Sequence, residues 1–212
     1  SRGVGLTIGE GLDLFEADAL RYALAASLPE QSDTELSVGE IGRRVNEELV
    51  ATWGNLVNRV LSMVHKTCEG SVPTADGRND GDRAVLEAVD ASLVTVTEQV
   101  ERVELRAALR TGMDAAAAVN AYLNATEPWK LAKADVGRAR AVLGTALAAV
   151  AGVRVALSPW LPFSTAMLDD VLGTVDSWER MEPTPGAPVP QPAPLFAKVD
   201  LEELLDNQAS GE

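Results

Sequence analysis

Polar side chains recur along one face of the segment ATWGNLVNRVLSMVHK. Asn55 and Arg59 are four residues apart, so a helix places them on the same side, and Ser62 and Lys66 continue the stripe. An amide and a guanidinium suit base edges and phosphates of a nucleic acid. No acidic residue occurs in the range 49–68 of this acidic chain. The stripe is a candidate binding surface, and the alternative is the solvated face of an ordinary amphipathic helix.

The tryptophan of the segment NATEPWKLAK is a second candidate. Trp129 follows Pro128, which fits the first turn of a helix because its missing N–H costs nothing there, and Thr126 suits an N-cap. The backbone under the ring is then rigid, which favours stacking because little entropy remains to be lost. Lys130 and Lys133 add positive charge beside the ring. The alternative is a half-buried ring that caps a helix bundle.

The composition indicates an acidic protein with a substantial core. The chain has 212 residues, of which 46% are hydrophobic, and this is enough for one large domain or two small ones. The formal net charge is −14, from 32 acidic and 18 basic residues. Taken over the whole chain, this charge argues against nucleic acid, so binding would require a surface that is locally basic.

The sequence lacks the residue groups of common catalytic and metal sites. His65 and Cys68 are the single histidine and the single cysteine, which excludes an internal disulfide and a Cys/His zinc site. A Ser/His/Asp catalytic arrangement is not supported, because no motif surrounds the single histidine. Phosphate-binding and dinucleotide-binding motifs are absent, so we expect no catalytic residue and no metal ligand. No apolar run is expected to span a membrane, because Arg154 interrupts the stretch 141–157. No signal peptide is recognised, and we expect a cytoplasmic protein.

The hydrophobic periodicity predicts an all-α fold, most simply an antiparallel helix bundle. Ser37 and Glu40 have capping-box spacing at the start of a long helix. We expect this helix, 38–67, to pack antiparallel to a second long helix at 83–110. The other expected helices cover 10–28, 114–124, 128–134 and 135–157, with a late helical segment that ends at Gly173. The proline-rich stretch beyond it predicts an extended tail that lies across the bundle.

Several stretches together resemble the C-terminal part of bacterial methionyl-tRNA synthetases, which are class I aminoacyl-tRNA synthetases. The stretch GNLVNRVLSMV and the stretch NAYLNATEPWKLAK are the most specific to this family, whereas FEADALRYALAAS is common to several class I synthetases. The resemblance covers essentially the whole chain in the family's order: 15–27, 54–64, 120–133, 157–173 and 192–200.

The chain departs from the family pattern at its beginning. Ser1 corresponds to the last serine of the Lys-Met-Ser-Lys-Ser loop that handles ATP, and both lysines are missing. The resemblance therefore assigns ATP and a zinc ion to a catalytic domain that this chain lacks, and it implies no cofactor in the chain itself. Glu16 also stands where the family usually has glycine.

The resemblance implies the anticodon-recognition part of a methionine–tRNA ligase, which reads the CAU anticodon in protein synthesis. In the family, the matching tryptophan stacks on an anticodon base and the matching Asn and Arg hydrogen-bond anticodon bases. These roles fall on Trp129, Asn55 and Arg59, and we expect supporting tRNA contacts from Lys66, Lys130 and Lys133. The implied partners are the anticodon loop of methionine tRNA and the catalytic domain of the same enzyme, with neither DNA nor a membrane.

The resemblance also divides the chain into three parts. Residues 1–36 are expected to be a linker that follows the catalytic domain and contacts the tRNA stem, residues 37–173 the helical anticodon-binding domain, and residues 174–212 the extended tail. Two alternatives stay open. One alternative is a free-standing helical module that is derived from this domain and binds tRNA or a protein. The other is the anticodon domain of a sister class I synthetase, which the stretch EPWKLAK disfavours.

Overall fold

The computed structural model describes residues 7–28, 36–74, 76–202 and 204. These residues form helices joined by loops, with an isolated antiparallel bridge between Ser71 and Pro188 as the only β-pairing in the described part of the chain. The all-α prediction is confirmed. The helices are α1 Ile8–Leu14, α2 Ala17–Ala26, α3 Val38–Arg44, α4 Asn55–Thr67, α5 Asp80–Glu101, α6 Leu105–Thr126, α7 Pro128–Ala134, α8 Val136–Leu157, α9 Pro162–Ala166 and α10 Asp169–Leu172, together with the π-helical stretch η1 Val45–Gly54.

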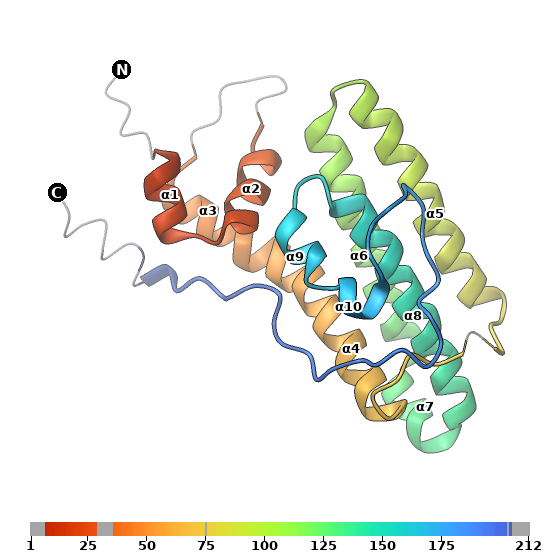
Figure 1. The fold of residues 1–212 in the computed structure, drawn as a ribbon. Coiled ribbons are helices and arrows are strands. Elements are labelled where there is room, and N and C mark those ends of the chain that lie inside the picture. The colour runs from red at the N-terminus through yellow and green to blue at the C-terminus, as the bar shows by residue number, and fades with distance from the viewer. Residues whose placement is uncertain (1–6, 29–35, 75, 203, 205–212) are drawn as a thin grey trace.

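Helix α8 forms the centre of the bundle. It packs against α4, α5, α6 and α7, and Figure 1 shows it crossing between them. Its residues are mostly Ala, Val, Leu and Gly, and 94% of its most apolar 18-residue stretch is buried inside the protein. A helix that is apolar all round has to be enclosed on every side, which explains this central position.

The length and composition of α8 would also allow it to cross a membrane. The expectation that no apolar run reaches that length is therefore wrong. Arg154 does not interrupt the helix, because its guanidinium donates from Nη1 to Asp169 Oδ1 at 2.9 Å and from Nη2 to Gly173 O at 2.6 Å. Since the apolar surface of α8 is covered by neighbouring helices, it is a core helix, and a charge within it is matched by a partner.

The predicted long helix 38–67 is observed as one continuous rod made of α3, η1 and α4. Ser37 caps its start by accepting a hydrogen bond from the Glu40 N–H at 3.2 Å. The middle of the rod is π-helical, a wider turn that the periodicity does not reveal. Its apolar face is buried as expected, at Trp53, Leu56, Val57, Val60, Leu61 and Val64.

Two expected helices are interrupted, and one expected pairing is wrong. The helix 10–28 is broken between α1 and α2, where Phe15 has extended dihedrals. The helix 83–110 ends at Glu101, and the chain turns at Val103, which has a positive φ of 60°, so α5 and α6 form a tight helical hairpin. Helix α5 packs on α6 and α8, and it is α6 and α8 that cover α4. The prediction that 38–67 pairs with 83–110 is therefore incorrect.

Residues 174–200 are extended and lie across the bundle, as expected for this part of the tail. Gly173 ends α10 with a positive φ of 77°. In Figure 1 the tail passes α8, crosses α4 near its C-terminal end and continues toward α1. Asn46 fixes it by donating from Nδ2 to Val199 O at 2.8 Å and accepting from Val199 N at 2.9 Å. Phe196 is buried next to Gly54, where an added Cβ would lie 3.2 Å from the ring.

A substitution at Trp53 tests the packing of the bundle core, because the side chain of Trp53 is fully buried. We expect Trp53→Ala to lower the free energy of unfolding by about 3–5 kcal/mol, as removal of a buried aromatic side chain leaves a cavity. Urea denaturation followed by circular dichroism measures this difference. A loss below about 1 kcal/mol, the size typical of a surface substitution, would contradict the central packing of the ring.

Candidate nucleic-acid interface

Arg59 lies at the centre of the candidate site, on α4. Its Nη1 donates to Asn120 Oδ1 at 3.1 Å and its Nη2 donates to Asn124 Oδ1 at 3.0 Å. Asn120 and Asn124 are one helical turn apart on α6, and Asn120 in turn donates from Nδ2 to Thr52 O at 3.1 Å. The guanidinium is thus held between two helices in a defined orientation. These two hydrogen bonds use two of its five N–H groups.

Trp129 lies beside this guanidinium, on the first turn of α7. Arg59 Cζ is 5.9 Å from the centroid of the indole ring, within the range of a cation–π contact. The ring is 42% exposed, whereas the preceding Pro128 is buried. The ring is therefore partly buried, as the alternative of a half-buried bundle cap requires, and the rest of its surface is accessible. The ring combines an accessible face with an anchored backbone, which is what stacking on a ligand requires.

The start of α7 differs from the expected N-cap. Thr126 is the last residue of α6, and its hydroxyl donates to Tyr122 O at 2.8 Å. Glu127 connects the two helices in the left-handed conformation, with φ 45°. A single strained residue therefore separates α6 from α7, and Pro128 occupies the first turn of α7 as predicted.

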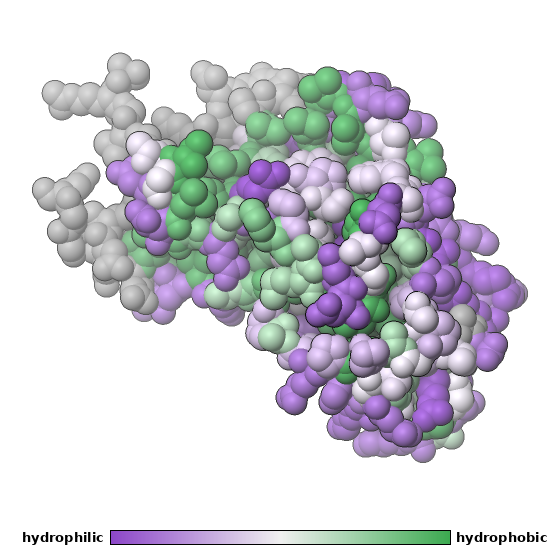
Figure 2. All heavy atoms as spheres, viewed as in Figure 1, coloured by the Kyte–Doolittle hydropathy of each residue, from purple (hydrophilic) through white to green (hydrophobic). Residues whose placement is uncertain are grey.

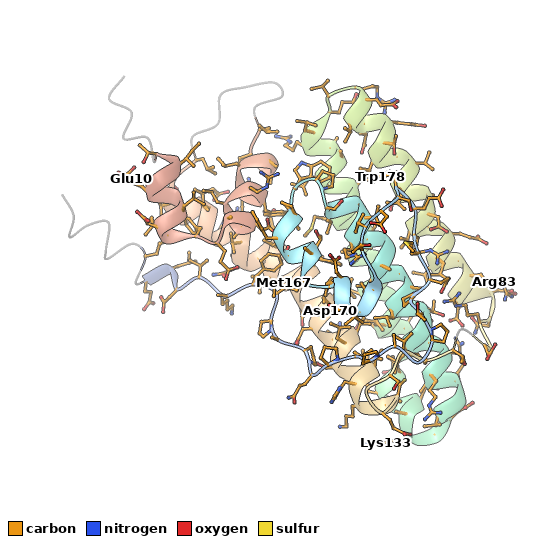
Figure 3. All side chains as sticks on the ribbon, viewed as in Figure 1. Glu10, Arg83, Lys133, Met167, Asp170 and Trp178 are labelled. Carbon is orange, nitrogen blue, oxygen red and sulfur yellow. The ribbon has the colours of Figure 1, made fainter. Side chains whose placement is uncertain are left out.

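The other predicted residues are spread along α4 and α7. Asn55 is exposed at the start of α4, one turn before Arg59, in a groove formed by η1, the beginning of α4 and tail residues 194–196. Lys66 is exposed in the last turn of α4. Lys130 is exposed and paired with Glu127 at 2.7 Å, so its charge is partly offset. Lys133 is exposed in the last turn of α7, and Figure 3 places it at the outer end of the bundle.

The surface at this end matches these placements. Figure 2 shows a mainly hydrophilic surface over the part of the molecule where Figure 1 places α7 and the ends of α4 and α8. Three of the four lysines of the sequence, Lys66, Lys130 and Lys133, belong to these helices. Three of the four lysine charges therefore lie on the helices that carry the candidate residues or on their neighbours, although the chain as a whole is acidic.

A buried carboxylate joins the start of α5 to the end of α6 and the start of α8. Asp82, in the first turn of α5, forms an ion pair with both terminal nitrogens of Arg138 and accepts a hydrogen bond from Tyr122 Oη at 2.6 Å. Its Oδ2 also accepts from Asn79 N at 2.9 Å. Burial by itself would raise the pKa of this carboxyl, but the hydrogen bonds from Arg138, Tyr122 and Asn79 outweigh burial and lower the pKa below its usual value. Asp82 is therefore ionised at neutral pH.

Asn120, Asn124 and Asp82 are not among the site residues predicted from the sequence. The two asparagines are four residues apart on a predicted helix, a signal that marks a shared face. Nothing in the sequence, however, shows that this face meets Arg59, because the contact joins residues about sixty positions apart. In the ranges that the structure describes, no group of three His, Cys, Asp or Glu side chains could hold a metal ion.

Comparison with known proteins decides the family. Residues 72–210 match the family described as the anticodon binding domain of methionyl tRNA ligase, and residues 1–61 match the family described as tRNA synthetases class I (M). The chain belongs to the methionyl-tRNA synthetase family. The chain therefore contains the anticodon-binding domain of this family, and the resemblance found in the sequence is confirmed.

Individual members of the methionyl-tRNA synthetase family cover almost the whole chain. The methionine–tRNA ligases of Thermobifida fusca and Roseiflexus sp. are each 37% identical to it, over 98% and 99% of the chain. The free-state crystal structure of Mycobacterium tuberculosis methionyl-tRNA synthetase superposes with a TM-score of 0.83 at 28% identity, over 92% of this chain and 41% of that one. The chain spans 40% of the length of these two ligases.

The exposure of Trp129 predicts a small stability effect. We expect Trp129→Ala to change the free energy of unfolding by about 1 kcal/mol or less, because the substitution removes a partly exposed ring and one cation–π contact and leaves no enclosed cavity. Urea denaturation beside Trp53→Ala gives the comparison. If Trp129→Ala were as destabilising as Trp53→Ala, the ring would be a core residue and unavailable for stacking.

Proposed function

We propose that this chain recognises the CAU anticodon of methionine tRNA as the anticodon-reading part of a methionine–tRNA ligase. The observation that carries the proposal is the guanidinium of Arg59, fixed by two asparagines beside the exposed ring of Trp129. Single-stranded loop bases are recognised by stacking on aromatic faces and by hydrogen bonds to their edges. Trp129 would stack on one base, and Arg59 and Asn55 would hydrogen-bond to base edges.

The arrangement supports recognition of bases as well as of phosphates. Two amide oxygens hold Arg59, so its remaining N–H groups point in fixed directions, and a fixed guanidinium distinguishes acceptor patterns on base edges. Lys66, Lys130 and Lys133 would supply sequence-independent attraction to the phosphates of the anticodon loop. The acidic remainder of the chain would limit binding to other nucleic acids.

We further propose that the rest of a longer ligase supplies the catalytic domain, and with it the sites for ATP and zinc. In this assignment residues 1–36 connect that domain to the helical domain 37–173, and residues 174–212 form the tail, whose described part lies on the body. The chain would work in the cytoplasm, where protein synthesis uses its tRNA, without a role at a membrane or on DNA.

The proposal predicts a specific loss of RNA binding. Trp129→Ala should weaken binding of a methionine-tRNA anticodon stem-loop by about tenfold or more, because one stacked base is worth about 1–3 kcal/mol. Arg59→Ala should cost a similar amount and relax the preference for one base. Fluorescence anisotropy with a CAU stem-loop, and with stem-loops altered at each anticodon position, measures both effects.

Trp178→Ala is the matched control for this experiment. Its ring is 39% exposed, close to the value for Trp129, and it packs on α5, where Nε1 donates to Leu93 O at 3.2 Å. Figure 3 places it far from Lys133 and the α7 end. We expect this variant to bind like the wild type. Equal affinity of the wild type for CAU and altered anticodons would reject anticodon reading and favour a free-standing interaction module.

The sequence also predicts that the 212-residue chain does not activate methionine by itself, because it lacks a nucleotide-binding motif. We expect no methionine-dependent exchange of pyrophosphate into ATP, measured with labelled pyrophosphate at high protein concentration. An intact family member assayed in parallel gives the positive control. Robust exchange by the purified chain would show that this prediction is wrong.

A further inference from the structure

Helix α7 is short and buries little of its own surface, so its position depends on its neighbours. It contains seven residues, of which only Pro128 is buried, and a helix of this length is not stable alone in water. It packs on α8 and touches α4. Its position, and with it the position of the Trp129 ring, is therefore set by the ends of the two helices that it joins.

Asp82 holds both of these ends. Tyr122 lies in the last turns of α6 and Arg138 in the first turn of α8, so the short stretch between them contains the whole of α7. Both side chains converge on the same carboxylate, whose own side chain is 0% exposed. The capping box between Asn79 and Asp82 fixes that carboxylate to the start of α5, through Asp82 N to Asn79 Oδ1 at 3.0 Å and Asn79 N to Asp82 Oδ2 at 2.9 Å.

We propose that Asp82 is a positioning residue for anticodon recognition, which sets the place of the Trp129 ring relative to Arg59 by joining the C-terminal end of α6 to the N-terminal end of α8. The proposal rests on the proposed function. Asp82 is fully buried, so it acts through the helices that it joins and not by touching the RNA.

The chemistry explains why a carboxylate is required. Arg138 is a permanent cation, and Asp82 is the acceptor for it and for the Tyr122 hydroxyl together. An amide at position 82 keeps the size of the side chain and removes its charge. The guanidinium would then lack a counter-ion in a largely enclosed site and would turn toward water, which releases the start of α8 from the end of α6.

Asp82→Asn is therefore the central variant, and Asp169→Asn is its matched control. Asp169 also pairs with a guanidinium of α8, that of the buried Arg154, but it does so from α10. In Figure 1 α10 and α7 are well separated. Both substitutions remove one carboxylate from an Asp–Arg pair of the same helix, so both lower the melting temperature. Only Asp82→Asn should weaken binding of the CAU stem-loop, by about tenfold, at a temperature where both variants are folded.

A second readout follows the ring without RNA. Incorporation of 5-fluorotryptophan gives fluorine resonances for the four tryptophans of the chain, and Trp129→Phe assigns one of them. We expect the Trp129 resonance to move in Asp82→Asn and to stay in place in Asp169→Asn. The milder Tyr122→Phe removes one hydrogen bond and keeps the ion pair, and it should move the Trp129 resonance in the same direction. This variant replaces Asp82→Asn in the experiment if Asp82→Asn does not fold.

The double variant tests whether Asp82 acts through Trp129. Asp82→Asn should add little to the loss that Trp129→Ala causes alone, because the ring that it positions is already absent. Additive losses, an unmoved Trp129 resonance, or equal loss of binding in Asp169→Asn would each overturn the proposal. Unchanged binding in Trp129→Ala would instead overturn the proposed function, so the two failures are distinguishable.

Discussion

The constraint on which the rest of the structure depends is the burial of α8. This helix is apolar on nearly every side, so the chain has to surround it, and α4, α5, α6 and α7 do so. Its small residues allow close approach, and a Cβ on Gly152 would lie 2.5 Å from Val89 Cγ1. The burial of this one helix thus brings together segments that are far apart in the sequence, including the two that carry Arg59 and its asparagine partners.

The binding surface depends on this packing because it is assembled at the end of the bundle. Arg59 comes from α4, its amide acceptors come from α6 and the ring comes from α7. Each helix brings one type of group, and the core sets the distances between them. The ring is partly exposed and Arg59 is half-buried, while their supports, Pro128 and Asp82, are buried. Recognition of single-stranded bases requires a binding surface that is accessible and a support under it that is rigid.

Much of the fold could be predicted from the sequence. The period of the apolar residues identified the rod 38–67 and its buried face, and Pro128 marked the start of α7. Helix ends within long apolar patterns were harder. The break at Val103 has no glycine or proline to mark it, and the apolar pattern continues through it into α6. The partner of the rod was predicted wrongly, because amphipathic faces show that a helix packs and do not show against which neighbour.

The sequence by itself determined the all-α class, the family and the identity of the candidate residues Asn55, Arg59 and Trp129, because residue types and their spacing along one helix are local properties. Only the tertiary structure decided that Arg59 lies 5.9 Å from the Trp129 ring, that two asparagines hold it, and that Asp82 joins the helices on either side of α7. These contacts join positions far apart in the chain, and the burial of α8 brings them together.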